Sequence, residues 1–373
     1  MNTFRNATVY VEGRGLIKTD LSFDAHIRAI GNALGEEIPL PEGAIVLPGF
    51  VDEHIHGADG CDGMDGTGES LSTIAKALPR EGTTSFLVTT MTNEKNKILA
   101  ALSSVKAYES KEGARVLGVH LEGPFLSLAY AGAQAKEHLL APSIKAFNDF
   151  QVAAGGKIKL VTLAPEPDGA KELIAHLVAS GVRVSLGHSG ASYADARHAI
   201  ALGADCVTHT FNAMSPIHHR DLGLAGAALL CDELYAELIC DGTHVSFPAV
   251  ELLLKNKPQD KLILVTDSMR AKYLPDGVSE LGGQTVFVKD GEARLENGKL
   301  AGSVLKMNEA VKNLAALTGD LCRAADCATK NPALHLGVYD EIGSIALGKR
   351  ADFAIVNRSL DVIATYVGGK RVY

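Results

Sequence analysis

Two histidines, His54 and His56, stand one residue apart in the segment LPGFVDEHIHG, directly after an apolar run at residues 44–51. A β-strand alternates its side chains with a period of two residues, so both imidazoles face the same side. Two imidazoles held in this way form half of a metal site, because imidazole nitrogen is a common ligand of transition metals. Two histidines this close also arise by chance, so the interpretation depends on where other metal-binding side chains fall.

Further candidate ligands follow later in the chain, namely Glu122, His188 and His209. A divalent catalytic ion takes three protein ligands and keeps one position for water, whose pKa it lowers towards neutrality. Two ions can share a carboxylate, and Glu122 is the natural bridge between a His54/His56 ion and a His188/His209 ion. The sequence therefore predicts one or two bound divalent ions. Histidine and carboxylate sites accept Zn, Fe, Mn and Co, so the sequence does not select among these metals.

A further carboxylate, Asp267, follows the last of the apolar runs described below. A carboxylate beside a metal-activated water can act as general base towards that water and then return the proton to the leaving group. We therefore expect a metal-dependent hydrolase with Asp267 as its catalytic acid and base.

Short apolar, β-branched runs recur along the middle of the chain, and each is followed by a loop and then a helix-like pattern. The runs are 44–51, 84–89, 114–120, 158–163, 182–186, 205–208, 235–240 and 261–265. Strands that alternate with helices imply a parallel sheet, and eight such units predict an α/β fold with a closed (β/α)8 TIM-like barrel.

Every candidate ligand and Asp267 come directly after one of these eight runs. Barrel enzymes keep their chemistry at the carboxyl ends of the strands, so side chains scattered along the sequence are expected to converge in one pocket there. His120 lies inside the third run, two residues before Glu122, and is able to face the same way. Four other histidines are read as structural, namely His26, His176, His198 and His335.

The two ends of the chain lack helical spacers and read as short strands and turns, such as 8–11, 17–21, 26–30, 353–356 and 362–367. We expect residues 1–43 and 341–373 to form one small β-sandwich domain beside a barrel domain of residues 44–340.

Composition excludes several classes of partner. The 373 residues carry a net charge of -8, which argues against a nucleic-acid or anionic-membrane surface. No apolar run approaches the roughly 20 residues that a membrane helix needs, and the amino terminus lacks the apolar segment of a signal peptide. The six cysteines show no C-x-x-C pairing, which is typical of a reduced, cytoplasmic protein.

The motifs around these residues resemble those of the N-acetylglucosamine-6-phosphate deacetylases of the amidohydrolase superfamily. The resemblance covers nearly the whole chain and includes HLEGPF (120–125), LGHSGA (186–191), THTFNAMSP (208–216), DGTH (241–244), VTDS (265–268), LAGS (300–303) and GSIALGKRADF (343–353). It implies that Glu122, His188 and His209 are the core metal ligands, that Asp267 is the catalytic acid and base, and that His244 binds the substrate.

The resemblance also implies the reaction, which is hydrolysis of N-acetyl-D-glucosamine 6-phosphate to D-glucosamine 6-phosphate and acetate. No glycine-rich phosphate loop is present. The loop after the sixth run offers Arg220, whose fork matches a phosphate, with Asn212 nearby. By resemblance, Arg220 reaches the active site of the neighbouring subunit in a homodimer, while the Ala213 backbone and the turn at Ser303 contact the sugar phosphate.

One position departs from the family. Some members carry a substrate-contacting histidine where this chain has Gln134. An amide donates hydrogen bonds but does not change charge in the working pH range. We hypothesise that a second metal ion, acting as Lewis acid, compensates for the missing histidine.

Alternatives remain open. The galactosamine epimer is the substrate if a single contact to one inverted hydroxyl differs, and unphosphorylated sugars stay open as substrates. A deaminase, a cyclic amidase or a catalytically inactive scaffold is a more distant alternative. Cys61, seven residues after His54, is either an ordinary loop thiol or an oxidation-sensitive group near the pocket.

Overall fold

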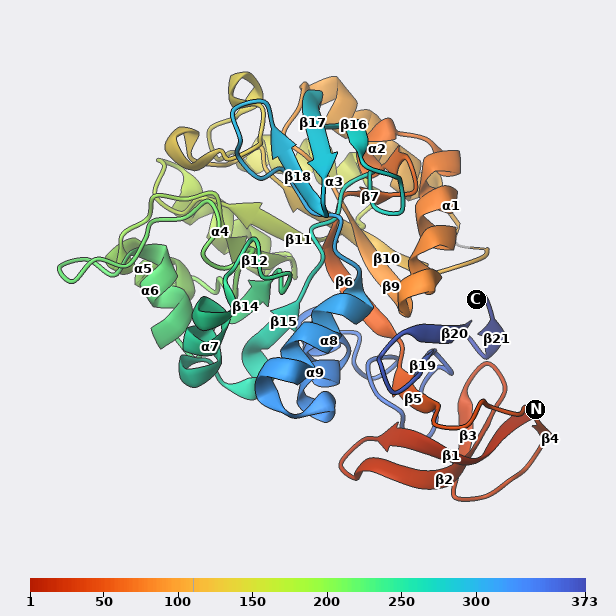
Figure 1. Cartoon of the computed structure of the whole chain (residues 1–373). Coiled ribbons are helices and arrows are strands. Elements are labelled where there is room, and N and C mark those ends of the chain that lie inside the picture. Colours follow the sequence, from red (N-terminus) through yellow and green to blue (C-terminus); the bar gives the residue numbers. More distant parts are fainter. Residues whose placement is uncertain (110) are drawn as a thin grey trace.

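The computed structural model describes residues 1–109 and 111–373 and consists of a barrel, a sheet built from both chain ends, and a small sheet above the barrel (Figure 1). Eight parallel strands, joined in this order, form the barrel wall: β6 (Phe50–Ile55), β9 (Thr83–Thr89), β10 (Arg115–Glu122), β11 (Ile158–Leu163), β12 (Arg183–Leu186), β13 (Cys206–Val207), β14 (Tyr235–Leu238) and β15 (Leu262–Leu264). The predicted α/β barrel is confirmed. Strands β6 and β9 are buried along their whole length, as expected where helices cover a parallel sheet.

The first and last barrel strands meet through the residues that follow them. The Asp267 N–H donates to the His54 carbonyl oxygen at 2.8 Å, and the His56 N–H donates to the Ser268 carbonyl oxygen at 2.9 Å. Thr266 Oγ1 also donates to the buried Asp52 carboxylate at 2.5 Å. These contacts nearly close the barrel and bring the loop that carries Asp267 against the His54–His56 pair.

Helices surround the barrel and connect its strands. They are α1 (Gly68–Ala77), α2 (Lys95–Ala107), α3 (Ile144–Ala153), α4 (Ala170–Ala179), α5 (Tyr193–Ala201), α6 (Gly223–Leu230), α7 (Phe247–Asn256), α8 (Met307–Thr318), α9 (Leu321–Ala328) and α10 (Lys330–His335). Helix α5 begins with a capping box, in which Ser192 and Asp195 each accept the other's backbone N–H. Within the described residues, no helix has both the length and the apolar character to cross a membrane.

The two chain ends share one eight-stranded sheet, and Figure 1 shows both termini beside it. Its strands are β1 (Asn2–Val11), β2 (Gly15–Phe23), β3 (Ile27–Ile30), β4 (Glu36–Glu37), β5 (Ile45–Pro48), β19 (Phe353–Val356), β20 (Val362–Val367) and β21 (Lys370–Arg371). The sheet curls around an aromatic core in which the rings of Phe4, Phe23, Phe353 and Tyr366 pack against one another.

The apolar run at 44–51 is not one barrel strand, because it divides at Gly49. Strand β5 pairs with β1 and β19 in the end sheet, whereas β6 begins the barrel. A Cβ atom at Gly49 would lie 2.2 Å from Thr84 Oγ1, so only glycine fits where the chain passes from one sheet to the other. The division into a 1–43 plus 341–373 unit and a 44–340 unit remains a proposal.

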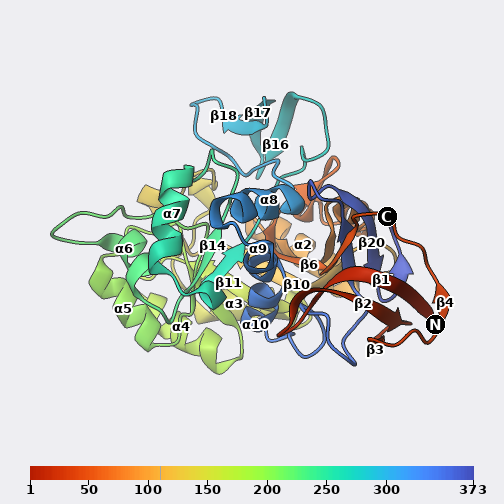
Figure 2. The same cartoon turned by 60° about the horizontal axis from the view of Figure 1, so that its bottom comes forward.

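A small antiparallel sheet follows the last barrel strand and was not predicted. It contains β16 (Gly277–Leu281), β17 (Gln284–Lys289) and β18 (Glu292–Leu295), and Figure 2 shows it above one end of the barrel. A short hairpin of β7 (Gly57–Ala58) and β8 (Cys61–Asp62) follows β6. The three-stranded sheet supplies part of the wall of the pocket described next.

Candidate active site

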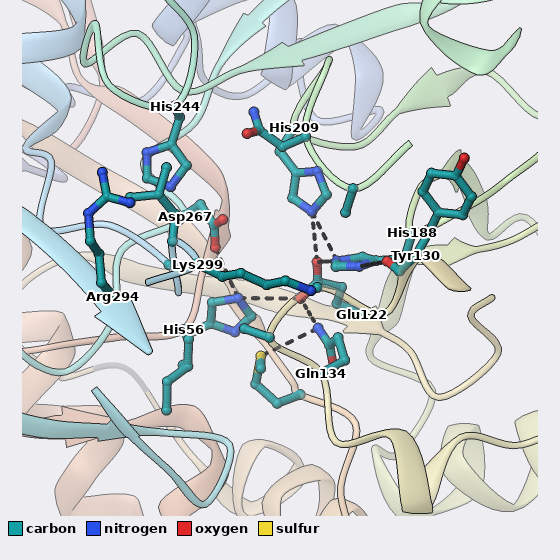
Figure 3. Close-up of a pocket in the computed structure, with 18 of the residues that line it drawn as sticks. His56, Glu122, Tyr130, Gln134, His188, His209, His244, Asp267, Arg294 and Lys299 are labelled. Carbon is teal, nitrogen blue, oxygen red and sulfur yellow. Dashed lines mark hydrogen bonds and ion pairs between the residues drawn. The ribbon is translucent and has the colours of Figure 1, made fainter. Parts of the chain in front are cut away.

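A pocket of about 460 Å³ lies at the carboxyl ends of the barrel strands (Figure 3). Nine of the residues singled out from the sequence line it: His56, Glu122, Gln134, His188, His209, Asn212, Ala213, His244 and Asp267. His54 lies buried directly behind this lining. These nine residues come from the ends of six of the eight barrel strands, so distant parts of the sequence meet at one cavity, as the barrel topology predicts.

The first cluster consists of Glu122, His188 and His209, whose ligand atoms all lie within 4.8 Å of one another. His188 Nε2 is 3.1 Å and His209 Nε2 is 3.3 Å from Glu122 Oε1, and the two Nε2 atoms are 3.1 Å apart. Figure 3 shows Glu122 between this histidine pair and Gln134. Two imidazole nitrogens and a carboxylate oxygen that converge on one point are able to hold a divalent cation.

The second cluster consists of His54, His56 and Asp267. His54 Nε2 is 3.4 Å and His56 Nε2 is 3.1 Å from Asp267 Oδ1. The same two nitrogens lie 3.6 and 3.4 Å from the two carboxylate oxygens of Glu122. Glu122 therefore faces both clusters, in the position of a bridge.

The burial and charge of the two clusters suit a bound cation. His54 Nε2 is buried and has no hydrogen-bond partner among the described residues, although three acidic groups surround the ring. Burial lowers the pKa of His54, but the carboxylates of Glu237, Asp267 and Glu122 outweigh this effect and raise the pKa well above its usual value. For Glu122 the directions are opposite. Burial raises the pKa of its carboxyl group, but the surrounding histidines lower it well below its usual value. A cation would take the place of the proton that the raised pKa lets His54 hold.

Two candidate ligands and the candidate acid have a left-handed backbone. The φ angles of His188, His209 and Asp267 are 49°, 31° and 47°, and each residue comes just after a barrel strand. Non-glycine residues seldom adopt positive φ, and such strain concentrates at functional sites. Here the sharp turn at each strand end directs the side chain into the pocket instead of along the strand.

Outer partners hold several of these side chains in place. Gln134 Nε2 donates to Glu122 Oε2 at 2.8 Å, and His188 Nδ1 donates to the Tyr130 carbonyl oxygen at 3.0 Å. The ring of His120 lies edge-on to that of His54 with centroids 4.6 Å apart. Burial lowers the pKa of His120 to about 3, so this ring stays neutral and packs beside the ligands.

His244 is also held by a neighbouring acid. Its Nδ1 lies 2.6 Å from Asp241 Oδ2, and its backbone N–H donates to Asp241 Oδ1 at 2.7 Å. With Nδ1 occupied, the rest of the ring faces the pocket, where Figure 3 shows it on the side of Asp267. This geometry suits a residue that contacts a substrate.

Besides His54, the candidates Ser303, Arg220 and Cys61 also lie outside the pocket lining. Ser303 is buried behind Asp267, where its N–H donates to the Asp267 carbonyl oxygen at 2.8 Å and its hydroxyl donates to the Thr266 carbonyl oxygen. Arg220 is exposed and its Nη1 contacts His219 Nε2 at 2.8 Å. Cys61 is a half-buried free thiol on the β7–β8 hairpin and does not line the cavity.

Sequence reasoning missed two contributions. The β16–β18 segment and the turn after it place Leu281, Arg294 and Lys299 in the pocket wall, and Figure 3 shows Lys299 extending across the pocket. Glu237, on β14, was also missed, although a single acid inside an otherwise apolar strand is a signal, because a buried carboxylate needs a partner.

Comparison with known proteins gives consistent matches. The model of the amidohydrolase family matches residues 45–372. The chain is 45% identical over 342 residues to N-acetylglucosamine-6-phosphate deacetylase of Bacillus subtilis (strain 168), which covers 90% of this chain and 86% of the relative. It is 34% identical over 373 residues to N-acetylgalactosamine-6-phosphate deacetylase of Escherichia coli O157:H7, covering 97% and 99% of the two chains.

A solved structure gives a similar result. The fold matches that of a mutant N-acetyl-D-glucosamine-6-phosphate deacetylase from Mycobacterium smegmatis, in complex with N-acetyl-D-glucosamine-6-phosphate, with a TM-score of 0.92 and 30% identity. The match covers 99% of this chain and 98% of the other.

Proposed function

The chain belongs to the amidohydrolase family, and we propose that it hydrolyses the acetamide of N-acetyl-D-glucosamine 6-phosphate to D-glucosamine 6-phosphate and acetate. The observation that carries this proposal is the placement of Glu122 between two histidine clusters at the floor of one pocket. Similarity to deacetylases along nearly the whole chain supports the choice of substrate.

Glu122, His188 and His209 would hold one divalent cation, and His54 with His56 would hold a second, with Glu122 shared between them. Such a cation supplies Lewis acidity towards the acetamide carbonyl and lowers the pKa of water. Histidine and carboxylate ligands suit Zn, Fe, Mn or Co, so the donor set does not select among these metals.

Asp267 is the proposed acid and base. Burial raises its pKa, but His54 and His56 outweigh this effect and lower it to about 2, so the carboxylate is ionised and able to accept a proton from the attacking water. The same proton then goes to the departing amine nitrogen as the carbon–nitrogen bond breaks. His244, whose Nδ1 donates to Asp241, is positioned to contact the substrate through its other ring nitrogen.

Phosphate recognition is proposed to involve Asn212, the Ala213 backbone and Arg220 of a neighbouring subunit in a homodimer. Arg220 does not line the pocket of its own chain, which is compatible with a role across an interface. Lys299 and Arg294 are the alternative cations, because both line the pocket within one chain. Ser303 is assigned a supporting role behind Asp267 instead of a substrate contact.

Deacetylation of the galactosamine epimer is the second candidate, because one of the similar relatives bears that name. The test is acetate release by metal-replete protein from N-acetylglucosamine 6-phosphate, its galactosamine epimer and unphosphorylated N-acetylglucosamine, side by side. Preference for the first substrate supports the proposal. Preference for the second identifies the galactosamine epimer as the substrate instead. Equal turnover of the unphosphorylated sugar contradicts the phosphate contacts. Release from none of them rejects the deacetylase function and favours a deaminase or a scaffold.

A further inference from the structure

A buried carboxylate that does not line the pocket connects the two histidine clusters. Glu237 lies on β14 with 0% of its surface exposed, inside the barrel and behind the candidate ligands. Its Oε2 atom is 2.9 Å from His54 Nδ1 and accepts the backbone N–H of His209 at 3.1 Å. A single oxygen atom therefore contacts one member of each cluster.

The contact with His54 fixes which nitrogen of that ring carries the proton. An ionised carboxylate only accepts hydrogen bonds, so Nδ1 must be the donor towards Glu237. The other nitrogen, Nε2, is then the one directed towards Asp267 Oδ1 and Glu122 Oε1, at 3.4 and 3.6 Å. A metal-ligating histidine whose second nitrogen donates to a carboxylate is held in orientation and becomes a stronger base.

The contact with His209 acts on the backbone. His209 has a φ of 31°, a conformation that neighbouring contacts must maintain. The Glu237 side chain accepts the His209 N–H, and the Glu237 carbonyl oxygen accepts the N–H of the next residue, Thr210, at 2.8 Å. Glu237 thus holds two successive backbone N–H groups of the turn that directs the His209 imidazole at Glu122.

The other histidines of the two clusters lack such a partner. His188 Nδ1 meets a neutral backbone carbonyl, that of Tyr130. His56 Nδ1 and His209 Nδ1 are buried without a hydrogen-bond partner among the described residues. Within these clusters, only His54 has a carboxylate behind it.

We propose that Glu237 is a positioning residue for both candidate metal sites, holding His54 with Nε2 towards the cation and fixing the strained turn at His209. This inference rests on the proposed metal-dependent function. It predicts that loss of Glu237 weakens cation binding before it alters substrate contacts, because Glu237 does not line the pocket.

The test is titration of chelator-treated protein with Co²⁺, followed by its absorption spectrum and by metal analysis. Glu237→Met removes the acceptor while keeping similar bulk, and we expect about a 10–100-fold weaker affinity at the cluster containing His54. Glu237→Gln keeps an acceptor oxygen for His54 and should recover part of that loss. At saturating Co²⁺, KM for the sugar phosphate should stay near that of the wild type.

Two controls separate positioning from general damage to the core. Glu53→Gln changes an equally buried carboxylate that pairs with His335, and it should leave Co²⁺ affinity unchanged. In a His54→Ala background, Glu237→Met should add little further loss at that cluster, because the two changes act through one ligand.

Specific results would overturn the inference. Folded Glu237→Met with wild-type affinity at every site contradicts it, and if that variant does not fold, wild-type affinity in Glu237→Gln contradicts it equally. If the wild-type protein binds no Co²⁺, the proposed metal-dependent function is rejected and this inference with it. If both wild type and variant bind Co²⁺ and turn over substrate normally, only the role of Glu237 is rejected.

Discussion

The amide of Gln134 donates to the carboxylate of Glu122, with 2.8 Å between Nε2 and Oε2. Gln134 is itself fixed, because its Oε1 accepts the backbone N–H of Thr92 at 2.7 Å. Gln134 therefore orients the carboxylate that faces both histidine clusters, in addition to lining the pocket.

Replacing Gln134 should separate these two roles. Gln134→Leu removes the hydrogen bond to Glu122, and we expect metal affinity to fall about 10–100-fold. Gln134→His restores the histidine seen in some family members, and its turnover at full metal occupancy should match that of the wild type if a second cation already activates the carbonyl. Metal content and kcat measured together test both expectations, and a large gain in kcat for the histidine variant would contradict the compensation hypothesis.

Asp267→Asn should abolish the proton transfers and leave the fold intact. The amide cannot accept the proton from water, so kcat should fall about 10²–10⁴-fold. The backbone contacts from Asp267 to His54 and Ser303 are preserved, and unfolding midpoints should therefore stay close to those of the wild type. An activity within a few fold of wild type would exclude Asp267 as the acid and base.

The source of the phosphate-binding cation can be tested by mixing inactive chains. If Arg220 acts across a dimer, Arg220→Ala and Asp267→Asn subunits refolded together in equal amounts should regain about a quarter of wild-type activity. Half of the randomly paired dimers are then mixed, and each mixed dimer keeps one of its two sites intact. Lys299→Ala mixed with Asp267→Asn should regain nothing if Lys299 acts within its own chain. KM for phosphorylated and unphosphorylated sugar should be compared in each single variant, since a true phosphate contact affects only the former.

The buried pair of His335 and Glu53 should make stability depend on pH. Burial lowers the pKa of His335, but Glu53 at 2.9 Å and the nearby Asp205 outweigh this and raise it to about 10. The folded pKa exceeds the unfolded value of about 6.5, so the stabilisation is complete below about pH 6.5 and is lost as the pH rises through about 10. His335→Gln should cost about 3–5 kcal/mol at the lower pH, because it leaves Glu53 buried without its partner.

Urea unfolding at several pH values gives the measurement for this pair. The difference between wild type and His335→Gln should shrink as the pH rises from about 6 to about 10. A constant difference across that range would show that His335 contributes by packing alone.

The sequence predicted the barrel and its pocket well because both depend on local patterns. Apolar runs mark parallel strands, and a polar residue that follows such a run must lie at the carboxyl end of the barrel. His56, Glu122, His188, His209 and Asp267 all follow this rule and meet in one cavity. Strands β19 and β20 were also predicted at their observed bounds.

Features that depend on distant partners were not predicted. Glu237 contacts a ring that is 183 positions earlier in the chain, and His335 pairs with an acid 282 positions away, so neither pairing has a local pattern. His335 was read as structural, and it is fully buried, but nothing near it in the sequence pointed to Glu53 as its partner.

The β16–β18 sheet was missed for a different reason. Its strands are partly exposed, as the alternating exposure of β17 shows, and the first of them carries few apolar residues. A search for continuous apolar runs therefore passes over it, although it supplies Leu281 and Arg294 to the pocket wall.

The end sheet also has a consequence for how the protein is made. Strand β5 pairs on one side with β1 and on the other with β19, which is synthesised only after the whole barrel. While the ribosome translates the intervening chain, β5 presents an open edge, the kind of surface that recruits other strands and promotes aggregation. The last few strands to leave the ribosome cover this edge, so a prematurely terminated chain would lack that protection even if most of its barrel were complete.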